Sequence, residues 1–251
     1  MCFRTVRVTV NNYEEVKPIH NVIGYIRGAV EPDRYVLLGN HHDAWVFGAV
    51  DPLSGSAAVT ELTRVFGLAL KQGHRPRRTV IFCSWDGEEY GLKGSVEWVE
   101  DKLRVLFHRG VAYLNLDMAA VSNYTVAIGA SPLLQDAMYQ SAKQVPSFDT
   151  EVGETLYDLW LVRPRSKNSS SAPDPYLEYS LGSGSDMAAF YQRAGVPCVD
   201  MWITYDEINV DILDYPLYHS SYETFFAFDN YIDPGFLATK AITQLLGVAA
   251  G

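Results

Sequence analysis

Three short apolar runs, two of them separated by a helical pattern, are the feature that most limits how this chain can fold. The runs are residues 35–38 (YVLL), 79–83 (TVIFC) and 111–116 (VAYLNL), and each has the length and side chains of a buried strand. From about residue 54 to residue 70, apolar side chains recur along one helix face. Alternating strands and helices predict an α/β fold with a mixed, largely parallel sheet flanked by helices on both faces.

Metal-binding side chains follow the ends of these strands or stand in turn-like segments nearby. Ligands of open α/β sheets bind beyond the carboxyl ends of the strands. Five side chains that can bind a divalent cation are placed in this way: His41, Asp51, Glu89, Asp117 and His219. Mixed histidine and carboxylate ligation suits zinc. Glu88 stands beside one of these residues as a spare carboxylate. The pattern predicts a two-zinc hydrolase with a built-in general base.

Other polar residues carry less information. Single histidines such as His20, His74 and His108 are more often surface or packed residues than ligands, and we assign them no role. Asp86 is by default a solvated charge, and a dipeptide such as Asp51–Pro52, taken alone, is a turn.

Four segments that contain these residues resemble one known family. They are residues 39–52 (GNHHDAWVFGAVDP), 75–79 (RPRRT), 84–91 (SWDGEEYG) and 215–219 (YPLYH). They closely resemble the protease domain of the glutamate carboxypeptidase II family. That family includes prostate-specific membrane antigen, the N-acetylated-alpha-linked acidic dipeptidases and, more distantly, the transferrin receptor. The likeness runs from about residue 21 to about residue 234 and implies a zinc-exopeptidase-type fold.

The resemblance implies a role for each ligand. Asp51 would bridge two zinc ions, His41 and Asp117 would complete one site, and Glu89 and His219 would complete the other. Such paired ions lie roughly 3.5–4 Å apart in two-metal hydrolases.

It also implies roles for residues beside the metals. Glu88 would be the general base, and Asp43 would hold His41 in the correct tautomer. Tyr218 would donate a hydrogen bond to the tetrahedral oxyanion, although it could be an ordinary packed tyrosine. The peptide bond between Asp51 and Pro52 is expected to be cis.

The residues that correspond to the family's substrate pocket differ from its pattern. Gly184 matches, Ser185 replaces an asparagine, and Asp200 and Trp202 occupy the positions of two arginines. An acidic substrate side chain would meet a carboxylate there, so a preference for acidic dipeptides is in doubt.

A calcium ion is the second metal that the resemblance implies. Glu97 and Glu100 match two ligands of the family's structural calcium, whose other ligands lie outside this segment. We expect these two residues to be solvated surface charges instead.

The chain is expected to be a single protease-type domain over residues 1–251. The family's apical domain and C-terminal helical dimerisation domain, which shape the pocket and the homodimer, have no counterpart in this sequence. The apolar content of 48% is ample for one core. We expect a closing helix over about residues 235–250, with more apolar surface than one packed face needs. This surplus predicts self-association.

Composition restricts partners and compartment. A net charge of −10 argues against nucleic acid. No run of about 18 apolar residues and no signal peptide is found, so an anchor like that of the family would lie upstream. Sequons at Asn123 and Asn168 would suit a glycoprotein of the secretory pathway or the extracellular space. Cys2, Cys83 and Cys198 imply no disulfide framework.

The predicted function is hydrolysis of a peptide or an acylated amino acid near a chain end, and a glutamate carboxypeptidase-like reaction is favoured. An aminopeptidase is the nearest rival hypothesis, because the same two-metal chemistry serves either end. Two further hypotheses are a non-catalytic scaffold like the transferrin receptor and an inactive truncated product.

Overall fold

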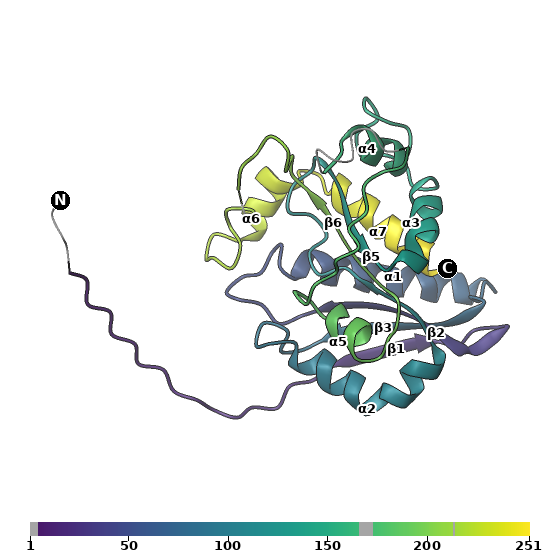
Figure 1. The fold of residues 1–251 in the computed structure, drawn as a ribbon, viewed down its shortest axis with the longest axis horizontal. Coiled ribbons are helices and arrows are strands. Elements are labelled where there is room, and N and C mark those ends of the chain that lie inside the picture. The colour runs from purple at the N-terminus through teal and green to yellow at the C-terminus, as the bar shows by residue number, and fades with distance from the viewer. Residues whose placement is uncertain (1–4, 166–172, 213) are drawn as a thin grey trace.

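The computed structural model describes residues 5–165, 173–212 and 214–251, whose centre is one six-stranded sheet of order β1-β3-β2-β4-β6-β5 (Figure 1). Strands β2 (Glu31–His41), β3 (Arg78–Trp85), β4 (Gly110–Asn115) and β6 (Cys198–Thr204) are parallel neighbours. The edge strands β1 (Val22–Ile26) and β5 (Thr125–Ala130) run antiparallel to β3 and β6. The predicted mixed, largely parallel sheet is therefore confirmed, and its three predicted runs belong to β2, β3 and β4.

Helices cover both faces of the sheet, because both faces are apolar. On one face, Leu38 and Phe82 pack in a core with residues of α1 (Leu53–Lys71), α3 (Gln135–Ala142), α4 (Leu156–Val162) and α7 (Leu237–Ala250). On the other face, Leu37 and Ile81 pack against α2 (Lys93–Arg109) and α5 (Met187–Gln192). Successive residues of one strand thus enter opposite cores, as a doubly covered sheet requires.

Short helices complete the chain. They are η1 (Pro132–Leu134), α6 (Phe225–Ala227) and η3 (Phe228–Ile232). The closing helix, expected over about 235–250, is α7; Ile242, Leu245 and Leu246 are fully buried, while Leu237 and Val248 are 54% and 37% exposed.

The structure also bears on a peptide bond, two cysteines, the helices and a sequon that the sequence singled out. The peptide bond between Asp51 and Pro52 is cis, as predicted. Cys83 and Cys198 are free and buried. In the described part of the chain, none of the helices is long and apolar enough to cross a membrane. Asn123 is exposed, whereas the sequon at Asn168 and the residue Cys2 lie outside the described residues.

Candidate metal centre

The parallel strands bring the predicted ligands to one edge of the sheet. His41 is the last residue of β2, Asp117 follows β4, and Glu89 follows β3. The Asn40 side chain joins two of these ends, because its Nδ2 donates to the carbonyl oxygens of Leu116 at 2.8 Å and Asp117 at 2.7 Å. Asn40 is 1% exposed, so the hydrogen bonds are shielded from water and hold the ends of β2 and β4 together.

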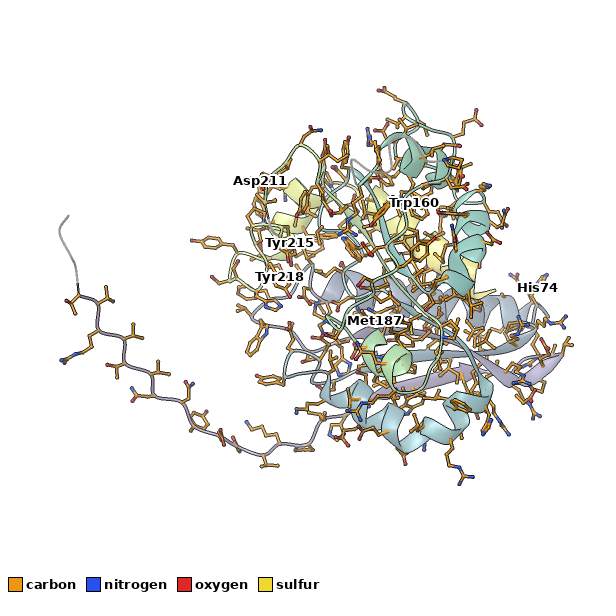
Figure 2. All side chains as sticks on the ribbon, viewed as in Figure 1. His74, Trp160, Met187, Asp211, Tyr215 and Tyr218 are labelled. Atoms are coloured by element: carbon orange, nitrogen blue, oxygen red, sulfur yellow. The ribbon has the colours of Figure 1, made fainter. Side chains whose placement is uncertain are left out.

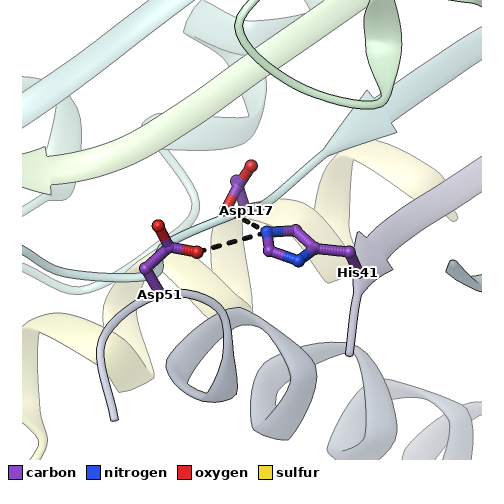
Figure 3. Close-up of side chains that lie close together, drawn as sticks. All are labelled: His41, Asp51 and Asp117. Atoms are coloured by element: carbon purple, nitrogen blue, oxygen red, sulfur yellow. Dashed lines mark hydrogen bonds and ion pairs between the residues drawn. The ribbon is translucent and has the colours of Figure 1, made fainter. Parts of the chain in front are cut away.

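Two groups of candidate ligands share the carboxylate of Asp51. His41 Nε2 lies 2.9 Å from Asp117 Oδ1 and 3.2 Å from Asp51 Oδ1 (Figure 3). His219 Nε2 lies 3.0 Å from Asp51 Oδ2 and 3.2 Å from Glu89 Oε2. In each trio, one ligand atom from every residue lies within 4.8 Å of the others. The structure therefore brings all five predicted residues together, with one Asp51 oxygen facing each histidine.

The donor set fits divalent cations. Asp51 is 5% exposed, and its buried Oδ1 makes no hydrogen bond to any described residue. Its nearest potential partner is His41 Nε2 at 3.2 Å, and a buried carboxylate oxygen that accepts no hydrogen bond is costly unless a cation compensates its charge. Histidine nitrogens and carboxylate oxygens in such trios are the ligands that zinc takes in hydrolase sites.

The charge balance of the cluster points the same way. Burial raises the pKa of Glu88 to about 9, and the nearby Asp117 carboxylate adds to this rise. Burial and the charge of Asp51 raise the pKa of Glu89 to about 7. Burial opposes protonation of His41, but the carboxylates around it, that of Asp117 first, raise its pKa far above the ordinary value. Without a bound cation, the raised pKa values of Glu88, Glu89 and His41 therefore favour the protonated forms of these side chains.

Asp43 contacts both His41 and the Glu88–Glu89 turn. His41 Nδ1 lies 2.9 Å from the main-chain carbonyl oxygen of Asp43 and 3.5 Å from its Oδ1. A carbonyl oxygen can only accept, so Nδ1 carries the proton and Nε2 is left to bind a metal. The Asp43 carboxylate accepts hydrogen bonds from the main-chain N–H groups of Glu88 at 3.0 Å and Glu89 at 3.2 Å.

Glu88 and Tyr218 flank the two ligand groups. Glu88 Oε2 lies 3.9 Å from His41 Nε2, and Glu88 belongs to neither trio. Gly87, at φ 71°, provides the left-handed turn between β3 and this residue. The Tyr218 ring stacks on His219 with centroids 3.7 Å apart. Burial and the charge of Asp51 raise the pKa of Tyr218, so its hydroxyl keeps the proton that it can donate.

Two of the predicted substrate residues, Ser185 and Asp200, lie next to the Asp117 side of the site. Asn115 Nδ2 donates to Ser185 Oγ at 2.8 Å and to Asp200 Oδ1 at 2.9 Å, and Ser185 Oγ donates to Asp117 Oδ2 at 2.5 Å. Ser185 is 3% exposed, and its hydroxyl donates its hydrogen bond to Asp117, so this hydroxyl is not available to donate to a substrate. Gly184 is exposed, and a Cβ atom there would meet nothing within 4 Å.

A guanidinium reaches this region from another segment. Arg165 lies over the Trp202 ring, with its Cζ 4.9 Å from the centroid, and its Nε donates to Glu207 at 2.6 Å. Burial raises the pKa of Asp200 to about 7. Sequence reasoning missed Arg165 and Asn115. Asn115 could have been found from the sequence, because a polar residue inside the apolar run of β4 needs a hydrogen-bond partner. Nothing in the sequence indicates that Arg165 stacks on Trp202.

The two residues that match calcium ligands of the family lie away from this cluster. Glu97 and Glu100 are exposed on α2, and Glu100 forms an ion pair with Arg193. Neither belongs to a group of three potential metal ligands among the described residues. That they are solvated surface charges and not calcium ligands stays a prediction.

A mixed sheet with candidate histidine and carboxylate ligands at its strand ends is the arrangement expected of a zinc-exopeptidase-type α/β fold. Comparison with known proteins agrees: this chain belongs to peptidase family M28, whose family model matches residues 21–239. The chain is 42% identical to mouse "Aminopeptidase NAALADL1" over 96% of its own length and 32% of that protein. It is also 42% identical to Arabidopsis thaliana "Probable glutamate carboxypeptidase LAMP1", over 94% of its length and 32% of that protein.

A solved structure shows the same fold. The zinc aminopeptidase BSAP from Bacillus subtilis superposes with a TM-score of 0.62 at 18% identity, covering 91% of this chain and 48% of that one. The present chain spans about one third of the length of the curated relatives it matches. The resemblance to the glutamate carboxypeptidase family is therefore confirmed.

Proposed function

We propose that this chain is the catalytic domain of a two-zinc exopeptidase. The observation that carries the proposal is the Asp51 carboxylate, whose two oxygens lie 3.2 Å from His41 Nε2 and 3.0 Å from His219 Nε2. His41 and Asp117 would hold one ion, and Glu89 and His219 the other. Lewis-acid activation of the scissile carbonyl and of the attacking water is the chemistry that bound zinc supplies.

The protein's own side chains would carry out the proton transfer. Glu88 is in reach of the cluster without being one of its ligands, so it is the group that takes the proton from water and passes it to the leaving amine. In the metal-free protein its pKa is raised to about 9, and added positive charge at the neighbouring ligands favours the carboxylate that a base requires. The Tyr218 hydroxyl would donate to the oxyanion that forms at the oxygen of the scissile carbonyl.

The substrate is proposed to be a peptide or an acylated amino acid cut at one end. Relatives of equal identity are named an aminopeptidase and a glutamate carboxypeptidase. The carboxypeptidase-like reaction is the leading candidate, and Asp200 favours the aminopeptidase as the second. A carboxylate beside the Asp117 half of the site suits a free amino group better than an acidic side chain. A single domain, a homodimer and a secretory or extracellular location also remain proposals.

A panel of short peptides tests the proposal. Zinc-loaded protein is incubated with peptides that are blocked at the amino end, at the carboxyl end or at neither, and products are identified by mass. We expect removal of a terminal residue that stops with a chelator and returns with zinc. The end that must be free separates the two candidate functions.

Two variants, each with one glutamate replaced by glutamine, provide a matched comparison. Glu88→Gln should lower kcat about 10²–10⁴-fold while zinc content is retained, because a positioned base is lost and no ligand is removed. Glu97→Gln, an exposed glutamate on α2, should leave kcat unchanged. Full turnover by the Glu88→Gln variant would refute the assignment of the base. A zinc-loaded wild type that cleaves none of the peptides would favour a non-catalytic role.

A further inference from the structure

We propose that Glu223 is a positioning residue that holds the Asp51 and His219 halves of one metal site together. This inference rests on the proposed function. Glu223 lies in the turn segment of residues 215–223 that carries His219, and it is only 1% exposed. Its side chain does not belong to either group of candidate ligands among the described residues. Its effect would come from the main chain that carries two of those ligands.

Each oxygen of the Glu223 carboxylate contacts a different segment. Oε1 accepts hydrogen bonds from the main-chain N–H groups of Val50 at 3.0 Å and Asp51 at 2.6 Å. Oε2 accepts from the Tyr215 hydroxyl at 2.8 Å and from the main-chain N–H of His219 at 3.2 Å. One buried carboxylate therefore joins Val50 and Asp51, which precede α1, to His219, which is 168 positions beyond Asp51 in sequence.

The main chain of Glu223 adds to this junction. Its carbonyl oxygen accepts the N–H of Ala49 at 3.2 Å, so the main chain as well as the side chain of Glu223 joins the segment before α1 to the turn that carries His219. Tyr215 and Tyr218 lie in the same part of the molecule (Figure 2), and the Tyr218 N–H donates to the Tyr215 carbonyl oxygen at 3.2 Å. The proposed oxyanion donor is thus carried by the segment that Glu223 holds.

Only a carboxylate of this length meets all four donors. A carboxylate is an acceptor at both oxygens and has about four lone-pair directions, all of which are used here. Glutamine would turn an NH₂ group towards two donors, and aspartate is shorter by one methylene. The buried donors would then lose charge-assisted hydrogen bonds that are about twice as strong as neutral ones.

The backbone conformation of His219 supports the positioning role of Glu223 independently. His219 has φ 56°, a left-handed conformation that non-glycine residues rarely adopt. Such a conformation persists where the surroundings hold it in place. The Glu223 carboxylate accepts the N–H of His219, and this contact fixes the strained residue with its Nε2 towards Asp51 and Glu89.

The geometry predicts an unequal effect on the two metal sites. His41 and Asp117 are held from β2 and β4 by Asn40 and Ser185, and neither contacts Glu223. The Asp51, Glu89 and His219 group depends on the junction. Both sites share Asp51, but only the Glu89–His219 site also depends on His219, whose N–H Glu223 accepts. Loss of Glu223 should therefore weaken the Glu89–His219 zinc site more than the His41–Asp117 site, whereas a general loss of stability would weaken both alike.

The experiment is chelator competition that yields two zinc dissociation constants, together with the melting temperature of the metal-free protein. For Glu223→Gln we expect the two zinc dissociation constants to rise unequally, one by tenfold or more and the other by less than threefold. Asp233→Asn is the matched control. Asp233 is also 1% exposed and likewise accepts main-chain N–H groups, but these are two, those of Ala238 and Thr239 in the first turn of α7. It should lower the melting temperature and leave both constants unchanged.

A second variant keeps the test decisive if Glu223→Gln fails to fold. Tyr215→Phe removes one of the four donors and should weaken the same site several-fold. Equal weakening of both sites, or unchanged constants in either folded variant, would overturn the role of Glu223. A wild type that binds fewer than two zinc ions would instead refute the proposed function, so the two failures can be told apart.

Discussion

Two glycines of α1 should respond in opposite ways to the same substitution. A Cβ atom added at Gly55 would lie 2.1 Å from the Leu116 carbonyl oxygen, 2.2 Å from that of Asp117 and 2.4 Å from Asn40 Nδ2. A Cβ atom added at Gly67 would meet nothing within 4 Å. Helix propensity alone favours alanine over glycine by about 1 kcal/mol at both positions. The two positions therefore separate propensity from packing.

The magnitude at Gly55 follows from what the new atom meets. All three distances fall below 3.0 Å, and two of the atoms are main-chain oxygens that cannot turn aside. Overpacking a core typically costs about 1–3 kcal/mol, and rigid neighbours put Gly55→Ala at the upper end. After the gain in propensity, we expect a net loss of about 2 kcal/mol. For a domain of this size that loss lowers the melting temperature by roughly 4–8 °C.

The assay is thermal and urea unfolding of the metal-free protein, followed by zinc titration. Gly67→Ala should gain up to about 1 kcal/mol and leave zinc binding unchanged. Gly55→Ala should also weaken zinc binding, because the atoms that must move carry Asp117. A Gly55→Ala variant that is as stable as Gly67→Ala would refute the close approach of α1 to the end of β4.

Two further predictions concern carboxylates near the site. Asp43→Ala removes the acceptor of the Glu88 and Glu89 N–H groups, so kcat should fall about 10–100-fold; unchanged kcat would contradict this role. Burial raises the pKa of Asp186 from 3.8 to about 7, so the folded protein holds a proton that the unfolded chain releases, and stability falls as pH rises through this range. Asp186→Asn should therefore stabilise metal-free protein at pH 8, by up to about 4 kcal/mol, and not at pH 4; urea unfolding at both pH values checks the sign.

Local pattern was sufficient for part of the fold and most of the candidate cluster. Strands β2, β3 and β4 are buried on both faces, so they are readable as apolar runs, and α1 has one clear apolar face. Ligands directly after such strands, as at His41 and Asp117, follow from the rule that sites lie at carboxyl ends. Assignment of each ligand to one ion came from the family resemblance.

Contacts between distant segments could not be read in this way. Glu223 is one glutamate among ordinary turn residues, and its partner Asp51 is 172 positions away. The Ser185 hydroxyl donates to Asp117 because the start of α5 packs beside β4, a placement that no local signal specifies. Arg165 reaches Trp202 from a polar loop. In each case the interaction depends on strand order and loop path.

The Asp51 carboxylate is proposed to lie between two zinc ions. Anomalous diffraction from zinc-loaded crystals, recorded on both sides of the zinc absorption edge, tests it most directly. We predict two peaks about 3.5–4 Å apart, one beside His41 and Asp117 and the other beside Glu89 and His219. A single peak in well-ordered, zinc-saturated protein, or two peaks that do not share Asp51, would contradict this claim.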